Sequence, residues 1–175
     1  DSTDIYMDSS TTKNLNVTGV NVGTLSYSSS DPSVATVSTS GDITPLKLGT
    51  TEITVTDQRS GLVKSITINI IKKVTATFTK NGGVSAMGST SLSCDITGGN
   101  DKCTVVAPTI TVDSGYNVIG WNESASATSG AKVGEELTLS NDTTYYTVAY
   151  KKLTATFNKN GATSQTDSTG VASNN

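Results

Sequence analysis

The residues that could do chemistry in this chain are scattered carboxylates, many hydroxyls and two cysteines, and histidine is absent. Without histidine, the usual general base, the Ser-His-Asp arrangement and the commonest zinc ligand are missing. The aspartates stand singly at turn sequences, and the adjacent Glu135 and Glu136 would point to opposite faces of a strand. Because a glycosidase needs two carboxyls that converge across a cleft, turn capping accounts better for these residues. We therefore predict no catalytic residue, no metal site and no cofactor.

The two cysteines, Cys94 and Cys103, enclose a short stretch with Gly98-Gly99 near its middle. This arrangement predicts a hairpin whose two arms carry the thiols. The spacing fits neither a C-x-x-C redox site nor a zinc-binding set. We predict a structural disulfide, worth about 2–3 kcal/mol for so short a loop, with free thiols as the alternative. A disulfide favours an oxidising, extracellular location.

Composition limits the partners of the chain. The 175 residues carry a net charge of −3 and only 15% charged side chains, so no basic surface is expected for nucleic acid. No apolar run approaches the ~20 residues that span a bilayer, so we predict no membrane span. The chain does not start with the charged and apolar regions of a signal peptide, and we expect Asp1 to lie inside a longer or processed chain.

The elements that must position these residues are strands. Ser and Thr together supply 55 residues, against two Phe and one Trp, which is typical of twisted sheets with thin cores. Ile66, Ile68 and Ile70 alternate with polar residues, as in a half-buried strand. We expect strands over residues 15–22, 25–28, 34–38, 42–48, 51–56, 64–71, 74–79, 91–96, 102–106, 109–112, 117–121, 136–139 and 145–151. The pattern predicts an all-β fold without helices.

One stretch appears twice. The segment KKVTATFTKNGG at 72–83 returns as KKLTATFNKNGA at 151–162, with nine of twelve positions identical at an offset of 79 residues. Such a fixed period marks the start of a module. We predict an elongated tandem array with domains at 1–71, 72–150 and an incomplete copy at 151–175. Because no Gly/Pro/Ser linker separates the first two, we expect a semi-rigid connection.

The first module resembles a known family. Its segments YSSSDPSVATVS at 27–38, GDIT at 41–44 and GTTEITVT at 49–56 follow the pattern of the bacterial immunoglobulin-like group 2 domain. The resemblance departs at Tyr27, where the family usually has Trp. It implies an immunoglobulin-like β-sandwich over residues 1–71.

The second module carries FTKNGG at 78–83, Pro108, GYNVIGW at 115–121 and DTTYYTVAY at 142–150. With these segments it resembles the Listeria–Bacteroides repeat (the internalin-B B-repeat type), a β-grasp-like unit of Gram-positive surface proteins. The resemblance implies a small β-grasp-like module over 72–150. Asn81-Gly82 suits a tight turn with positive φ. Large rings are rare in this Thr-rich module, so we predict that they form its hydrophobic centre and structural core: Phe78, Tyr116, Trp121 and Tyr150.

The third copy begins at Lys151 and lacks the later elements of the module, so it cannot close alone. Either the chain continues, or this strand is lent to a neighbouring sheet edge, which is a common mode of recognition. We predict a possible assembly strand that presents Leu153, Ala155 and Phe157.

Gram-positive surface modules sometimes carry Lys–Asn isopeptide bonds. Lys72 or Lys73 with Asn141 forms a candidate pair of this kind.

Two functional classes follow from these observations. The favoured one is a non-enzymatic structural or adhesive segment of a secreted bacterial cell-surface protein, acting as a semi-rigid stalk or binding module. The alternative is a subunit of a phage virion decoration, fibre or extracellular filament that assembles through β-strand contacts. The expected location is extracellular, at the bacterial or virion surface. Its expected partners are other modules of the chain or neighbouring subunits, with host protein or glycan as further candidates.

Overall fold

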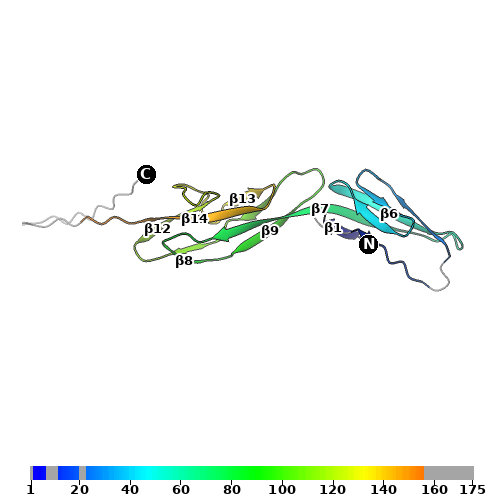
Figure 1. Ribbon diagram of the computed structural model, residues 1–175, viewed down its shortest axis with the longest axis horizontal. Coiled ribbons are helices and arrows are strands. Elements are labelled where there is room, and N and C mark those ends of the chain that lie inside the picture. Colours follow the sequence, from blue (N-terminus) through cyan, green and yellow to red (C-terminus); the bar gives the residue numbers. More distant parts are fainter. Residues whose placement is uncertain (1, 7–11, 20–22, 156–175) are drawn as a thin grey trace, which may run out of the picture. The chain divides into compact units, whose positions relative to one another are not determined.

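In the computed structural model, residues 2–6, 12–19 and 23–155 are described, and every regular element among them is a β-strand (Figure 1). This confirms the predicted all-β fold. The chain divides into two compact units. The first holds the described residues up to Thr75 together with Ser93–Thr104 and Thr138–Asp142. The second holds Ala76–Leu92, Val105–Leu137 and the described residues from Thr143.

The first unit is a sandwich of two sheets. The strands of the sandwich are β1 (Ser2–Tyr6), β2 (Lys13–Asn14), β3 (Leu25–Ser29), β4 (Ala35–Val37), β5 (Asp42–Pro45), β6 (Gly49–Asp57) and the first part of β7 (Val63–Thr79). One sheet has the order β3-β6-β7, with β1 on the other side of β7, and the other has the order β2-β5-β4. Both sheets contribute buried aliphatic side chains to one core, formed by Ile5, Val34, Ala35, Ile43, Ile53, Ile68 and Ile70.

The predicted strand at 15–22 is wrong where the structure describes it, because residues 15–19 form no strand and residues 20–22 lie outside the described residues. The first strand of the sandwich is β1 instead, which sequence reasoning missed. Ile5 at 3% exposure supplies the one buried apolar side chain of β1. A single apolar residue among polar neighbours gives no alternation to detect.

Strand β7 belongs to both units. It runs for 17 residues without a break, where the sequence predicted two strands at 64–71 and 74–79. The division between the units falls inside it, after Thr75. Ile68 and Ile70 are buried in the first unit, and Ala76 and Phe78 are buried in the second. Buried residues lie on both sides of the dilysine, Ile70 and Ile71 before it and Val74 after it, while Lys73 is exposed and Lys72 is half-buried.

The remaining strands are β8 (Val84–Met87), β9 (Ser91–Ile96), β10 (Cys103–Val106), β11 (Ile110–Val112), β12 (Tyr116–Asn122), β13 (Glu136–Leu139) and β14 (Thr143–Lys151). Strand β14 pairs with β12 on one side and with β7 on the other, and β9 also pairs with β7. Two small two-stranded sheets, β8-β11 and β10-β13, complete the set. The β-grasp-like assignment and the domain limits at 72 and 151 stay predictions.

Two of the pairings are parallel. Strand β1 runs parallel to β7, from Ser2 opposite Thr67 to Tyr6 opposite Ile71. Strand β14 also runs parallel to β7, from Thr143 opposite Ala76 to Tyr146 opposite Thr79. Parallel neighbours cannot be joined by a tight hairpin, so each pair joins segments that are far apart in the sequence.

Candidate functional site

The aspartates at the turns of the first unit cap the backbone there. Ser33 donates both its backbone N–H and its hydroxyl to Asp31 Oδ1, at 3.0 and 2.6 Å. The Ser40 hydroxyl donates to Asp42 Oδ2 at 2.6 Å. These hydrogen bonds favour the charged carboxylates, so the pKa values of Asp31 and Asp42 lie below their ordinary value. Groups held ionised in this way are poor general acids.

Asp57 has the same role at the end of β6. Its carboxylate accepts the Ser60 hydroxyl at 2.7 Å and the backbone N–H groups of Arg59 at 3.0 Å and Gly23 at 3.1 Å. The Ser60 hydrogen bond is the largest cause that lowers the pKa of Asp57. The side chain therefore ties two loops together.

In the described part of the chain, no group of three or more His, Cys, Asp or Glu side chains could hold a metal ion.

A cluster of three aromatic rings forms the centre of the second unit. Phe78 and Trp121 meet edge to face with ring centroids 4.8 Å apart, and Phe78 stacks on Tyr145 at 5.9 Å. Their exposed fractions are only 2%, 1% and 6%. The indole N–H of Trp121 donates to the carbonyl oxygen of Pro108 at 2.9 Å, so this buried donor is satisfied. Burial, followed by the nearby Glu123 carboxylate, raises the pKa of Tyr145.

The sequence analysis predicted Phe78 and Trp121 in this centre and missed Tyr145. Tyr145 lies beside Tyr146 in a run of polar residues, so composition alone could not tell which ring faces inward. Period-2 alternation would have favoured Tyr146, which shares its face with Val148 and Tyr150, whereas the structure buries Tyr145 and Thr147 on the other face.

The other two predicted rings, Tyr116 and Tyr150, are half-buried. Tyr116 packs over Gly83, where a Cβ would collide with the ring. Gly83, with φ of +81°, carries the positive φ that the sequence analysis assigned to Asn81-Gly82. The Tyr150 hydroxyl accepts a hydrogen bond from Asn117 Nδ2 at 3.0 Å. Both tyrosines thus pack against the backbone and polar groups of their surroundings.

A close backbone approach fixes the strand that carries Trp121. The N–H of Trp121 donates to the Ala131 carbonyl oxygen, and the Ala131 N–H donates back to the Trp121 carbonyl, both at 2.8 Å. Gly120 lies at an irregularity in the β12–β14 register with φ of +153°. A Cβ on Gly120 would collide with the Ala131 carbonyl oxygen, so only glycine fits there.

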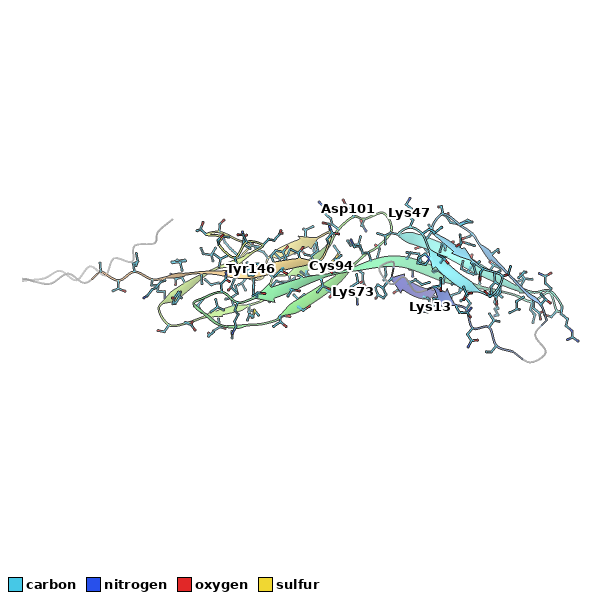
Figure 2. All side chains as sticks on the ribbon, viewed as in Figure 1. Lys13, Lys47, Lys73, Cys94, Asp101 and Tyr146 are labelled. Atoms are coloured by element: carbon cyan, nitrogen blue, oxygen red, sulfur yellow. A yellow bond between two sulfur atoms is a disulfide. The ribbon has the colours of Figure 1, made fainter. Side chains whose placement is uncertain are left out.

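The cysteines are bonded. Cys94 on β9 and Cys103 on β10 form a disulfide with an S–S distance of 2.05 Å and Cα atoms 6.0 Å apart. This confirms the predicted disulfide, and the two half-buried cysteines close a loop with a separation of nine residues. Figure 2 labels Cys94 among the side chains.

The candidate isopeptide pair lies in hydrogen-bond contact. Lys72 Nζ donates to Asn141 Oδ1 at 2.8 Å and to the Ser140 carbonyl oxygen at 3.2 Å. Next to it, the Thr75 N–H donates to Asp142 Oδ1 at 2.8 Å. These bonds fasten the residues before β14 to β7.

The predicted assembly strand is exposed where the structure describes it. Leu153 is 54% exposed and Ala155 is exposed, and both follow the end of β14 without belonging to a strand. Phe157 lies outside the described residues. The N–H of Lys152 donates to the Gly115 carbonyl oxygen at 2.7 Å, and thereby extends the pairing of β14 by one residue.

In the described residues, no helix is long and apolar enough to cross a membrane.

A search of curated proteins finds no match to this chain. Among solved structures, the chain is similar to human protocadherin-24 EC1-2, at 10% sequence identity and a TM-score of 0.31, over 84% of this chain and 94% of that one. Residues 16–68 match the family model of the bacterial Ig-like domain (group 2), which confirms the family predicted for the first module.

Proposed function

We propose that this chain is a non-enzymatic structural or adhesive segment of a secreted bacterial cell-surface protein, in which it acts as a semi-rigid stalk or binding module. The observation that carries the proposal is the match of residues 16–68 to the bacterial Ig-like domain of group 2. The disulfide between Cys94 and Cys103 supports an oxidising compartment outside the cytoplasm. Capped and ionised aspartates in the turns support a structural role for the acidic side chains.

The second module is proposed to be a repeat of the Listeria–Bacteroides type. The features in its favour are the buried Phe78 and Trp121, which come from two of the motifs that carry the resemblance. Asn81 lies in the first of these motifs. Its N–H donates to Thr147 Oγ1 at 2.7 Å and its side-chain amide to the Thr147 carbonyl oxygen at 3.1 Å. In this reading Asn81 has a structural role, since it anchors the end of β7 on β14.

Location is the property to test first. Antibodies against this chain should label intact cells of the source organism, and protease added outside the cells should remove the label. A cytoplasmic protein used as the control should resist the same treatment. Recovery of the chain only from the cytoplasmic fraction would contradict the proposal, and copurification with virus particles would favour the virion alternative.

The expected partners are neighbouring modules or subunits, reached through the segment after β14. Exposed Leu153 and Ala155 support this, because an unpaired extended segment can add to a sheet edge. Truncation after Lys151 keeps β14 whole and should abolish head-to-tail association of the purified chain in sedimentation velocity. A full chain with Leu153→Asp is the point-variant counterpart and should associate more weakly. Unchanged association of both variants would exclude the segment as the contact.

A further inference from the structure

Strand β7 takes part in a parallel pair in each unit. In the first unit, β1 pairs with the first part of β7 over five positions. In the second unit, the end of β7 pairs with β14 over four positions. The first pair joins the first strand of the chain to the strand that runs from the first unit into the second, and the second pair joins that same strand to the last strand of the second unit.

This arrangement decides how tension acts on the hydrogen bonds. When two parallel strands are pulled from opposite ends, they slide past each other, and the bonds that cross between them are all loaded together. When an antiparallel pair is pulled apart from one end, its bonds break one at a time. A pair loaded in shear therefore needs a larger force, because several hydrogen bonds must fail in one step.

We propose that this chain bears mechanical tension between its two ends, and that the parallel pairs β1–β7 and β7–β14 are the two clamps that resist it. The proposal goes beyond the function proposed above, because it depends only on topology and holds wherever the two ends are attached. It also assigns a role to β1, a short strand at the edge of its sheet.

The first clamp is reinforced by side chains along β1. Ile5 is buried in the core of the sandwich. Asn69 Nδ2 donates to Asp4 Oδ1 at 3.0 Å, directly across the pair. The ammonium of Lys73, labelled in Figure 2, lies 5.1 Å from the centre of the Tyr6 ring, within range for a cation–π interaction. Sliding of β1 along β7 would break all three contacts.

The second clamp is reinforced at both of its ends. Before the paired residues, the Thr75 N–H is bonded to Asp142. After them, Asn81 donates two hydrogen bonds to Thr147, whose side chain is 1% exposed. A hydrogen bond shielded from water is stronger than an exposed one, so we expect the bonds to Thr147 to hold longer under load.

Strand β7 connects the two clamps. Its first part is the last strand of the first clamp and its end is the first strand of the second. Because β7 has no loop between these parts, tension that leaves one clamp passes along a single strand into the other.

Single-molecule force spectroscopy tests the proposal with the full chain. Handles at the two termini load both clamps in shear. Handles at Ser26 and Thr56, which face each other near one end of the antiparallel β3–β6 pair, load the same protein in the unzipping direction. We expect unfolding at clearly higher force from the termini than from Ser26 and Thr56. Equal or lower force from the termini would overturn the proposal, and this comparison needs no substitution that could impair folding of the clamps.

Proline variants of β1 locate the first clamp. Successive N–H groups of a strand point to opposite sides, so one of Thr3 and Asp4 donates to β7 and the other points away. Thr3→Pro and Asp4→Pro should therefore differ, and the one that removes a crossing bond should shorten the lifetime of the first unit at constant force by roughly 2- to 10-fold. Asp4→Ala reports the loss of the Asn69 contact alone. The lifetime of the second unit should not change in any of these variants.

Wild-type lifetimes in both proline variants would show that β1 bears no load. That result would leave the cell-surface function standing, because surface labelling does not depend on mechanical resistance. Conversely, a cytoplasmic location with intact clamps would contradict the proposed function and leave the mechanical inference in place.

Discussion

Phe78 is the residue at which the stability of the second unit can be tested most directly. It touches both of the other rings in the aromatic cluster, Trp121 edge to face and Tyr145 in a stack. Phe78→Leu keeps an apolar side chain of similar size and removes both aromatic contacts. The change therefore measures what the ring geometry adds beyond burial.

The expected magnitude follows from the two contacts. An aromatic pair contributes about 0.5–1.5 kcal/mol beyond the area it buries, so two pairs contribute roughly 1–3 kcal/mol. Imperfect packing of leucine in the ring-shaped site adds less than about 1.5 kcal/mol. We expect Phe78→Leu to destabilise the second unit by roughly 1–4 kcal/mol. At a urea dependence of about 2 kcal/mol per molar, the unfolding midpoint should fall by about 0.5–2 M.

The assay is urea unfolding followed by the fluorescence of Trp121, the one tryptophan of the chain. Because Trp121 is 1% exposed, its emission should shift to longer wavelength when the unit opens. Thr77→Ala is the matched control, since Thr77 is the exposed neighbour of Phe78 on the same strand. Its free energy of unfolding should stay within about 0.5 kcal/mol of the wild-type value. A double-mutant cycle with Tyr145→Leu should give a coupling of about 0.5–1.5 kcal/mol. Equal midpoints for Phe78→Leu and Thr77→Ala would refute this account of the core.

Three further outcomes are expected. Replacing both Cys94 and Cys103 by serine should lower the free energy of unfolding by about 2–3 kcal/mol, measured by urea unfolding followed by circular dichroism. Dithiothreitol should lower the stability of the wild type by the same amount and leave the variant unchanged. Equal midpoints with and without the disulfide would contradict the prediction. Gly120→Ala should destabilise by about 3 kcal/mol or more in the same assay, because of its positive φ and the collision of its Cβ, whereas Gly82→Ala, whose Cβ meets nothing within 4 Å, should fold normally. Hydrogen bonds lower the pKa of Asp57 in the folded protein. The stabilisation by its carboxylate is therefore present above the unfolded pKa of about 4 and is lost as the pH falls through the folded pKa. The melting temperature should decline more steeply on acidification in the wild type than in Asp57→Asn, and parallel curves would contradict a role for this carboxylate.

The strands that could be predicted from the sequence are those with clean alternation. Ile66, Ile68 and Ile70 identify the first part of β7 because each is separated from the next by a polar residue. Strand β8 was missed because Val84 is its only buried residue and glycines flank it on both sides. Local patterns thus report burial only where at least two or three inward residues repeat.

The pairing of the strands could not be predicted in the same way. Nothing local in Ser2–Tyr6 indicates that it lies beside Thr67–Ile71, since parallel pairing is set by contacts between distant segments. The aromatic centre was predicted in part, because Phe78 and Trp121 are rare ring types in this chain, whereas the choice between Tyr145 and Tyr146 depends on which way one strand faces.

The parallel pairs also determine the order in which this chain can fold. Ser2 can pair only after Thr67 has been synthesised, and Ala76 only after Thr143. Each parallel pair therefore forms only after some 65 further residues of the chain have been synthesised. Contacts at such separation carry a large loop-closure entropy and slow folding.

During synthesis or export, β1 and the end of β7 therefore emerge well before the strands with which they pair in parallel. For that interval their backbone N–H and C=O groups on that side are open to any other extended chain. Charged residues in or beside these segments, Asp4 in β1 and the two lysines before the end of β7, limit the aggregation that such a delay would otherwise invite.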